Sequence, residues 1–113
     1  MATVADVRRI ALGLPRTTEK PSYGTPGFRV ADTLFARLRD DDETLVAWVG
    51  SEEEKAELIA SAPETYFTTS HYDGYPSVLV RLAAIDAAEL SEILTEAWRV
   101  RAPRKLVAEH SGG

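Results

Sequence analysis

Residues 64–82 constrain the fold of this chain more than any other segment, because they predict two strands joined by a tight turn. Asp73-Gly74 accepts the left-handed backbone angles that a hairpin turn requires. The run that follows, Ser77–Leu82, is rich in β-branched and apolar residues, as strands are. We therefore expect an antiparallel hairpin here, and with it an antiparallel sheet.

Three other segments have the periodicity and the capping residues of helices. Thr3-x-x-Asp6 resembles a capping box and predicts a helix over residues 4–13. Ser51 is expected to begin a second helix, which ends at Pro63 and turns four apolar residues inward: Ala56, Leu58, Ile59 and Ala62. Asp86 is expected to begin a third, which Ala102-Pro103 ends and which carries a clear apolar stripe: Leu90, Ile93, Leu94, Ala97 and Trp98. A short final turn or helix is expected over 104–109.

Strands are predicted over 17–23, 27–30, 33–38 and 44–49, with a type II turn at Pro26-Gly27. Helices separated by hairpin-linked strands favour an α+β fold, a two-layer sandwich in which helices pack on one face of an antiparallel sheet. One domain over residues 1–109 and a flexible tail over 110–113 are expected. The predicted core consists of Val7, Ala11, Leu34, Val46, Trp48, Leu58, Val78, Val80, Leu90, Leu94 and Trp98.

Charge is distributed unevenly along the chain. The net charge of −5 argues against a general nucleic-acid binder. However, residues 1–39 carry seven basic and three acidic side chains, whereas residues 40–64 carry one basic and nine acidic. Four cations also fall together near the C-terminal end: Arg99, Arg101, Arg104 and Lys105. A positive surface on a negative protein is therefore compatible with the sequence.

Several classes of protein are excluded or disfavoured. The absence of cysteine excludes disulfides and thiolate chemistry. No apolar run approaches the length of a membrane span, and the first residues lack the apolar core of a signal peptide, so we expect a cytoplasmic protein without membrane contact. The acidic run Asp40–Glu43 lacks the pattern of a calcium loop. We expect a monomer without metal or cofactor.

Catalytic motifs are not found. His71 is the only histidine outside the expected tail, and its polar neighbours on a strand would point to opposite faces. A role for His71 as a general base rests only on the range in which imidazole titrates. We therefore expect a non-enzymatic protein.

Polar aromatic residues and arginines recur beside the turns. The turn at Asp73-Gly74 should hold His71 and Tyr75 close together at one end of the sheet, with Tyr23 from the upstream turn. Aromatic faces beside arginines are suited to stacking bases and pairing phosphates. The same residues would also suit a shallow recess for a small ligand or a protein partner. A third interpretation is purely structural, with the rings half-buried and their polar atoms bonded to turn backbone.

Several segments together resemble the MmcQ/YjbR family, in matching order and spacing from about Val4 to Leu106. They are Lys20–Arg29, Leu34–Leu38, His71–Pro76, Val80–Leu82, Glu89-Leu90, Ala97-Trp98 and Ala102-Pro103. The resemblance implies a frataxin-like (CyaY-like) fold and the DNA-binding role commonly attached to the family, and it supplies no catalytic residue. Frataxin binds iron through acidic residues around its first helix and strand; here that helix carries Arg8 and Arg9 with only Asp6, so iron binding is not expected.

DNA binding is therefore the first hypothesis, and a small-ligand or protein-interaction surface around His71 is the alternative. The matched polar positions, together with the C-terminal cations, are the candidate binding residues. They are Tyr23, Arg29, Arg37, His71, Tyr75, Arg81, Arg99, Arg101, Arg104 and Lys105.

Overall fold

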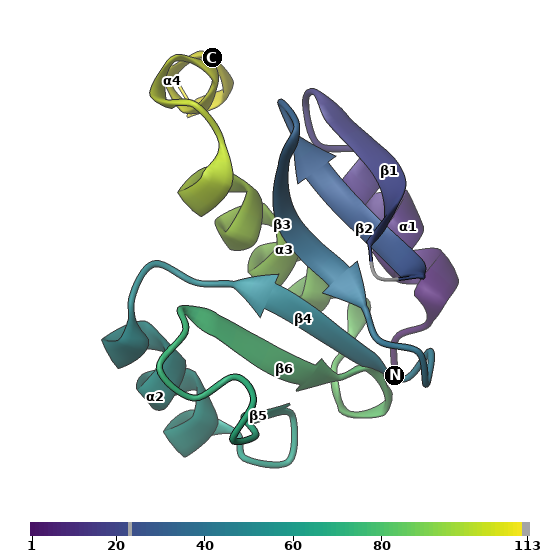
Figure 1. The fold of residues 1–113 in the computed structure, drawn as a ribbon, viewed down its shortest axis with the longest axis vertical. Coiled ribbons are helices and arrows are strands. Elements are labelled where there is room, and N and C mark those ends of the chain that lie inside the picture. The colour runs from purple at the N-terminus through teal and green to yellow at the C-terminus, as the bar shows by residue number, and fades with distance from the viewer. Residues whose placement is uncertain (23, 112–113) are drawn as a thin grey trace.

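A six-stranded antiparallel sheet forms one layer of the molecule, and helices pack on one of its faces (Figure 1). The computed structural model describes residues 1–22 and 24–111. The strands lie in the order β1-β2-β3-β4-β6-β5. This arrangement confirms the predicted α+β fold.

The elements follow the predicted order closely. The strands are β1 (Thr17–Ser22), β2 (Thr25–Val30), β3 (Thr33–Leu38), β4 (Thr44–Trp48), β5 (Tyr66–Phe67) and β6 (Ser77–Arg81). The helices are α1 (Val4–Leu12), α2 (Glu52–Ser61), α3 (Ala87–Arg101) and α4 (Arg104–Ser111), with a single 3₁₀ turn, η1, at Leu82–Ala84.

Side-chain caps begin the first three helices, as their sequences predict. The hydroxyl of Thr3 accepts the N–H of Asp6, and the Asp6 carboxylate accepts the N–H of Thr3, which completes a capping box. Ser51 and Asp86 accept the N–H groups three residues further on, at 3.1 and 2.8 Å. These bonds satisfy backbone donors that have no partner within the helix.

The core lies between the sheet and helices α1 and α3. Trp98 of α3 is fully buried, and its indole N–H donates to the carbonyl of Pro15 at 2.9 Å. Most of the predicted core is buried with it. Leu34, Trp48 and Leu58 are instead half-buried, and Ala56 is exposed. The inward-facing position next to Ala56 is taken by Lys55, which is only 5% exposed.

The predicted tight turn at Asp73-Gly74 is wrong. Tyr66 pairs with Val80 and Phe67 with Leu79, so the two strands are joined by a nine-residue loop over residues 68–76. We call this segment the 68–76 loop. Gly74 does adopt a positive φ of 84°. The loop, however, forms turns of its own, and Pro76 has no N–H with which to extend the strand pairing.

The turn between β1 and β2 also differs from the prediction. Pro26-Gly27 lies inside β2, and the left-handed φ of 81° belongs to Gly24. Gly27 is needed for close packing, because a Cβ there would lie 2.9 Å from the Cβ of Ser22. The predicted first strand reached Tyr23, which lies outside the described residues.

The C-terminal end is more regular than the expected tail. Helix α4 includes His110 and Ser111, and the ring of His110 lies 4.9 Å from that of Trp98. The helical pattern therefore continues two residues beyond the predicted boundary at residue 109.

Candidate functional site

The face of the sheet opposite α1 and α3 carries the candidate site. Side chains alternate between the two faces of a sheet, and directly paired residues share a face. Arg37 is paired with Val46, and Val46 with Leu79, across β3, β4 and β6. The neighbouring residues Ala36, Ala47 and Val78 belong to the core under the helices. Arg37 therefore projects from the opposite face, which we call the open face.

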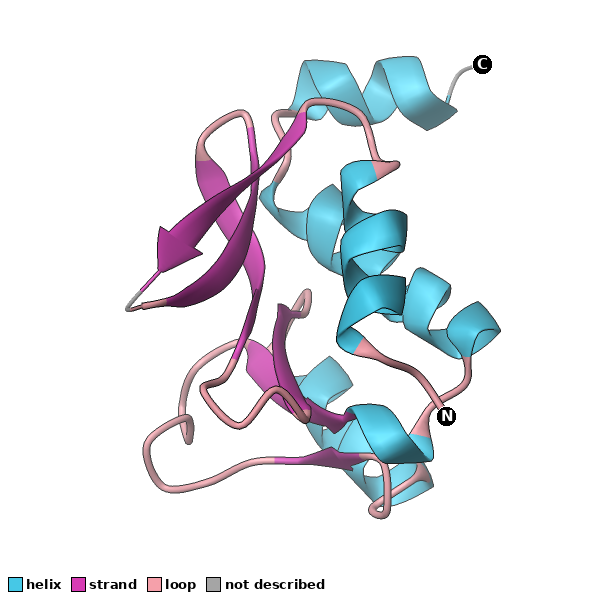
Figure 2. Cartoon of the chain, turned by 90° about the vertical axis from the view of Figure 1, so that its right-hand side faces the viewer, coloured by secondary structure: helices cyan, strands magenta, loops and turns pink. Residues whose placement is uncertain are grey.

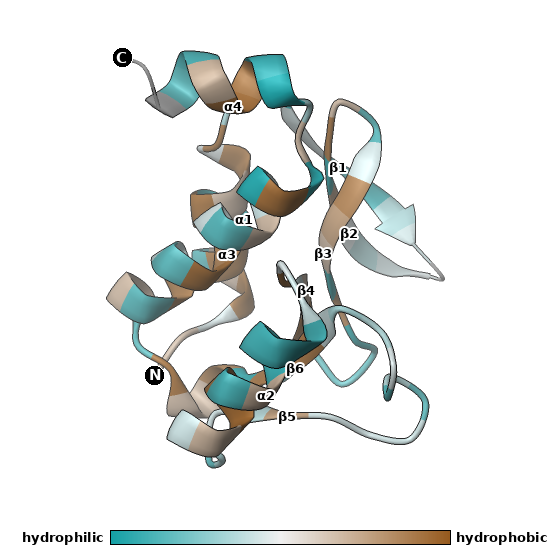
Figure 3. Cartoon of the chain, turned by 90° about the vertical axis from the view of Figure 1, so that its left-hand side faces the viewer, coloured by the Kyte–Doolittle hydropathy of each residue, from teal (hydrophilic) through white to brown (hydrophobic). Residues whose placement is uncertain are grey.

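The 68–76 loop covers part of the open face. Arg37 donates a hydrogen bond to the hydroxyl of Tyr72, although β4 separates β3 from β6, the strand that the loop precedes. The loop must therefore cross β4, and this explains why Val46 and Leu79 are buried on a face without α1 or α3. Figures 2 and 3 show the loop on the side of the sheet away from these helices. In Figure 3 the loop is coloured white to teal, which marks residues of intermediate to hydrophilic character.

Strand β5 fixes the beginning of this loop. Burial raises the pKa of the Tyr66 phenol above its ordinary value, and the neighbouring carboxylate of Glu89 adds to the effect. The phenol therefore stays protonated and donates to Glu89 on α3. This bond ties β5 to the helical layer.

Between the loop and the sheet lies a groove of about 790 Å³, which we call the open-face groove. Its lining residues come from β3, β4, the loop and the start of β6: Leu34, Arg37, Trp48, Ser70, His71, Tyr72, Tyr75, Pro76 and Ser77. Tyr75 is an exposed aromatic residue among them, at 61%. Four rings and one guanidinium thus share a single groove.

A second arginine borders this groove through Trp48. The guanidinium of Arg101, at the end of α3, lies 5.1 Å from the centre of the Trp48 ring, and its Nε donates to the carbonyl of Leu34 at 3.0 Å. A guanidinium at this distance from an indole face makes a cation–π contact. The contact holds the Trp48 ring beside Leu34.

A smaller recess of about 240 Å³ adjoins the groove. The two share Arg37, His71 and Tyr72, and the recess adds Thr25 together with Arg39 and Asp40, which directly follow β3. The imidazole of His71 is exposed and lies edge-on to the Tyr72 ring at 5.2 Å. Two arginines and a histidine therefore surround Tyr72 on this side, with one carboxylate among them.

The structure brings together only part of the predicted binding set. Arg37, His71 and Tyr75 line the open-face groove, and Arg101 borders it. Tyr23 lies outside the described residues. The remaining predicted residue of the hairpin, Arg81, lies over the ring of Phe67 at 4.0 Å and donates to the carbonyls of residues 63 and 64.

The other predicted cations lie elsewhere. Arg29 donates to the carbonyl of Asp32 in the turn after β2. Arg99 is paired with Glu96 on α3 at 3.6 Å. Arg104 and Lys105 are exposed in the first turn of α4. Of the four cations near the C-terminal end, Arg101 alone therefore borders the groove that Arg37 lines.

Sequence reasoning placed two of the groove residues in the core. Leu34 and Trp48 were assigned there because they belong to apolar strand segments. The continuous apolar run of β4 is typical of a strand buried on both faces and does not say what covers each face. Lys55, which lies under the loop, was missed altogether.

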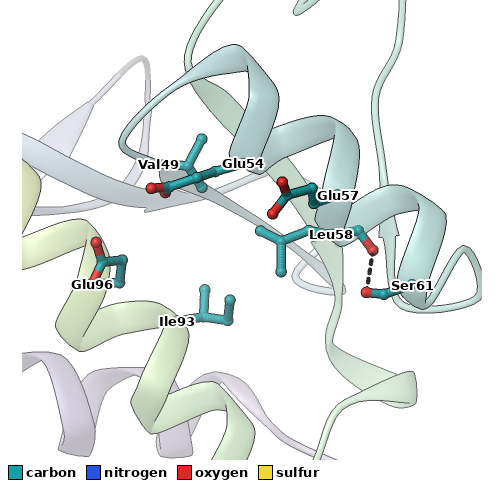
Figure 4. A pocket seen from close by; sticks show the side chains of 7 residues that line it. All are labelled: Val49, Glu54, Glu57, Leu58, Ser61, Ile93 and Glu96. Carbon is teal, nitrogen blue, oxygen red and sulfur yellow. Dashed lines mark hydrogen bonds between the residues drawn. The ribbon is translucent and has the colours of Figure 1, made fainter.

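A different hollow lies between α2 and α3, and its charge is unsuited to an anion. Figure 4 shows Leu58 and Ile93 near its centre and three carboxylates around it, from Glu54, Glu57 and Glu96. Its volume is about 370 Å³. Glu54 already accepts the N–H of Gly50, and Glu96 is paired with Arg99. Phosphate groups would be repelled here, whereas the open-face groove has Arg37 as its charged lining residue.

Comparison with known proteins identifies the family of this chain. The family model YjbR matches residues 12–100. The chain belongs to the YjbR family. This confirms the resemblance to MmcQ/YjbR proteins. The YjbR match contains all the residues that line the open-face groove and ends one residue before Arg101.

Relatives of this YjbR protein are found in mycobacteria. The uncharacterised proteins Mb2600 of Mycobacterium bovis and Rv2570 of Mycobacterium tuberculosis are each 42% identical to it over 124 aligned residues, which cover 95% of this chain and 94% of theirs. The crystal structure of Deinococcus radiodurans protein DR2400, with family-model domain DUF419, superimposes with a TM-score of 0.74 at 25% identity. The match covers 88% of this chain and 78% of that one.

Two further features of the described residues bear on partners. In residues 1–22 and 24–111, no helix combines the length and the apolar character needed to cross a bilayer. Within the same described part of the chain, no three His, Cys, Asp or Glu side chains are grouped as a metal site would require.

Proposed function

We propose that this YjbR protein is a non-enzymatic DNA-binding protein that holds a single strand in the open-face groove. The observation that carries the proposal is the placement of Arg37 beside Trp48, Tyr72 and Tyr75 in one groove. Proteins that bind single strands combine aromatic rings, on which bases stack, with cations that pair with the backbone phosphates.

The arrangement assigns a role to each kind of side chain. The exposed ring of Tyr75 and the half-buried ring of Trp48 provide faces for bases. Arg37, with Arg39 in the adjoining recess, brings positive charge to the position of a phosphate. Arg101 keeps its guanidinium against Trp48 and adds a charge at the far border of the groove.

A single strand fits these features better than a duplex. Duplex binding depends on many cations spread along one surface. The net charge is −5, and Arg81, Arg99, Arg104 and Lys105 lie outside the groove. A short strand with one or two paired phosphates needs fewer cations, because stacking supplies about 1–3 kcal/mol for each base.

The second candidate is a small anionic ligand with a planar ring. The observation that favours it is the size of the groove, since about 790 Å³ lies within the range of small-molecule sites, roughly 300–1,000 Å³. A nucleotide would use the same rings and the same Arg37 without requiring a path for a longer strand.

Fluorescence anisotropy separates these candidates. A short labelled oligothymidylate is titrated at low and at higher salt, with a labelled duplex and unlabelled mononucleotides as comparisons. We expect the single strand to bind more tightly than the duplex. Tyr75→Ala should weaken binding about 5- to 150-fold, the effect of losing one stacked base. Arg37→Ala should weaken binding and reduce the salt slope by about one charge.

Arg99→Ala is the matched control, because Arg99 is an arginine outside the groove. It should leave affinity and salt slope nearly unchanged. If Arg99→Ala and Arg37→Ala weaken binding equally, the groove is not the binding surface. Binding of mononucleotides without oligonucleotides would favour the second candidate, and no binding of either DNA at low salt would remove the DNA hypothesis.

A further inference from the structure

Lys55 is an unusual residue for the inner side of a helix. It is the only buried residue of α2, although three glutamates precede it and a fourth follows at position 57. Its side chain is among the least exposed polar groups of the protein, at 5%. Removing an ammonium group from water is costly unless its donors are satisfied. The contacts of Lys55 therefore indicate what the burial achieves.

Both contacts of the ammonium group are to the 68–76 loop. Lys55 Nζ donates to the carbonyl of Tyr72 at 2.6 Å and to the carbonyl of Tyr75 at 3.1 Å. Within the described residues, no carboxylate pairs with it. The two carbonyls flank the Asp73-Gly74 turn, where no neighbouring strand is available to bond them.

One other backbone bond among the described residues joins the loop to the sheet, at the end of the loop, where the N–H of Val49 donates to the carbonyl of Pro76 at 2.9 Å. The bonds within the loop are local: the N–H groups of Tyr72 and Asp73 both donate to Thr69, and that of Tyr75 donates to Tyr72. Such turns fix the shape of the loop but not its position. Tyr72 is fixed at both ends, since Arg37 holds its hydroxyl and Lys55 holds its carbonyl.

From this geometry we infer that Lys55 is a positioning residue, which holds the outer wall of the open-face groove by bonding the backbone of Tyr72 and Tyr75. Lys55 does not line the groove itself. The consequence for ligand affinity rests on the proposed function, whereas the effect on the loop does not. Without the ammonium group, the carbonyl of Tyr75 loses this donor and that of Tyr72 keeps the N–H of Tyr75 alone, so the rings of Tyr72 and Tyr75 lose their fixed position over the sheet.

Lys55→Met tests this inference, because methionine has similar length and helix propensity but no donor. Lys105→Met is the matched control, since Lys105 is exposed on α4. Amide hydrogen exchange gives the first readout, at the N–H groups of Tyr72, Asp73 and Tyr75. We expect at least about tenfold faster exchange there in Lys55→Met, with unchanged protection in β4 and β6. Affinity for oligothymidylate, the second readout, should fall about tenfold.

The two readouts distinguish the two proposals. If the loop amides exchange faster but the wild-type protein binds no DNA, the proposed function fails and the role of Lys55 stands. If Lys55→Met leaves the loop amides as protected as Lys105→Met does, the inference is wrong whatever the DNA result. Should Lys55→Met not fold, Lys55→Gln is the second variant, because glutamine keeps N–H donors on a shorter side chain. Faster exchange of the loop amides, with unchanged protection in the strands, would support the inference in that variant. Equal loss of protection in the loop and in the strands would mean that Lys55 stabilises the whole fold and not the wall of the groove.

Discussion

Replacing Trp98 with alanine should be among the most destabilising single substitutions in this protein. The indole is fully buried at the centre of the helical layer, where α3 packs on the sheet and on α1. Loss of a buried tryptophan ring costs about 3–5 kcal/mol, because transfer free energy is lost and a cavity remains. Such a loss is a large part of the stability of a typical domain, about 5–15 kcal/mol.

The structure places the expected loss in the upper half of this range. The indole N–H donates to the carbonyl of Pro15 at 2.9 Å, and the substitution leaves that carbonyl without its donor. The side chain of His110 on α4 also lies against the ring, so α4 loses a contact as well. Trp98→Phe, which keeps a ring but not the N–H, should cost roughly 1–3 kcal/mol.

Urea denaturation followed by far-ultraviolet circular dichroism measures these changes without relying on tryptophan fluorescence. Trp48→Ala is the matched control: its ring is half-buried on the open face, so about 1–2 kcal/mol is expected. The reasoning would be refuted by a loss below about 1 kcal/mol in Trp98→Ala, which is the size expected of a surface substitution. A larger loss of stability in Trp48→Ala than in Trp98→Ala would refute it too. The main core would then lie on the open face and not between the sheet and α3.

Two further predictions concern the loops. Hydrogen bonds from residues 43–44 lower the pKa of Asp41 below its ordinary value of 3.8. The stabilisation by the Asp41 carboxylate is therefore complete above pH 3.8 and is lost as the pH falls through the lower folded-state pKa. In urea titrations, Asp41→Asn should be less stable than wild type at pH 7 and should lose less stability on acidification. Gly27→Ala should lower the free energy of unfolding by about 1–3 kcal/mol, since the new Cβ would lie 2.9 Å from the Cβ of Ser22. Gly50→Ala is the control and should cost less in the same assay, because its Cβ would meet only the end of the flexible Glu54 side chain.

Helix α3 shows what local sequence information can predict. Asp86 caps it, the apolar stripe faces the core, and the helix ends at Arg101, just before Ala102-Pro103. Each of these features depends on residues within about four positions of one another, because helical hydrogen bonds and capping bonds have that span. The prediction therefore needed no knowledge of the rest of the fold.

The hairpin shows where such reasoning stops. Asp73-Gly74 does contain the left-handed glycine of a turn, but β5 ends at Phe67 and β6 begins only at Ser77. The position of the 68–76 loop depends on Lys55 and Arg37, which lie 17 and 35 residues from Tyr72. No turn propensity carries information about donors so distant in the sequence.

The candidate site was predicted in part for the same reason. Arg37 was predicted to lie on a strand, with His71 and Tyr75 at nearby turns, and the structure places all three in one groove. Leu34 and Trp48 were taken for core, because an apolar residue on a strand has the same pattern whether a helix or a solvent-filled groove lies above it. Their exposure depends on which elements cover the open face.

The amino-acid sequence by itself determined the order and approximate limits of the elements, the α+β class and the apolar layer under α3, because periodicity, capping and turn chemistry act over short distances along the chain. Only the tertiary structure decided which cations share a surface. Arg81, Arg99 and Arg104 face different surroundings from Arg37, while Lys55 lies beneath a loop that crosses β4. Those outcomes depend on strand pairing and on long-range hydrogen bonds, which follow from the free energy of the whole packed molecule rather than from any one segment.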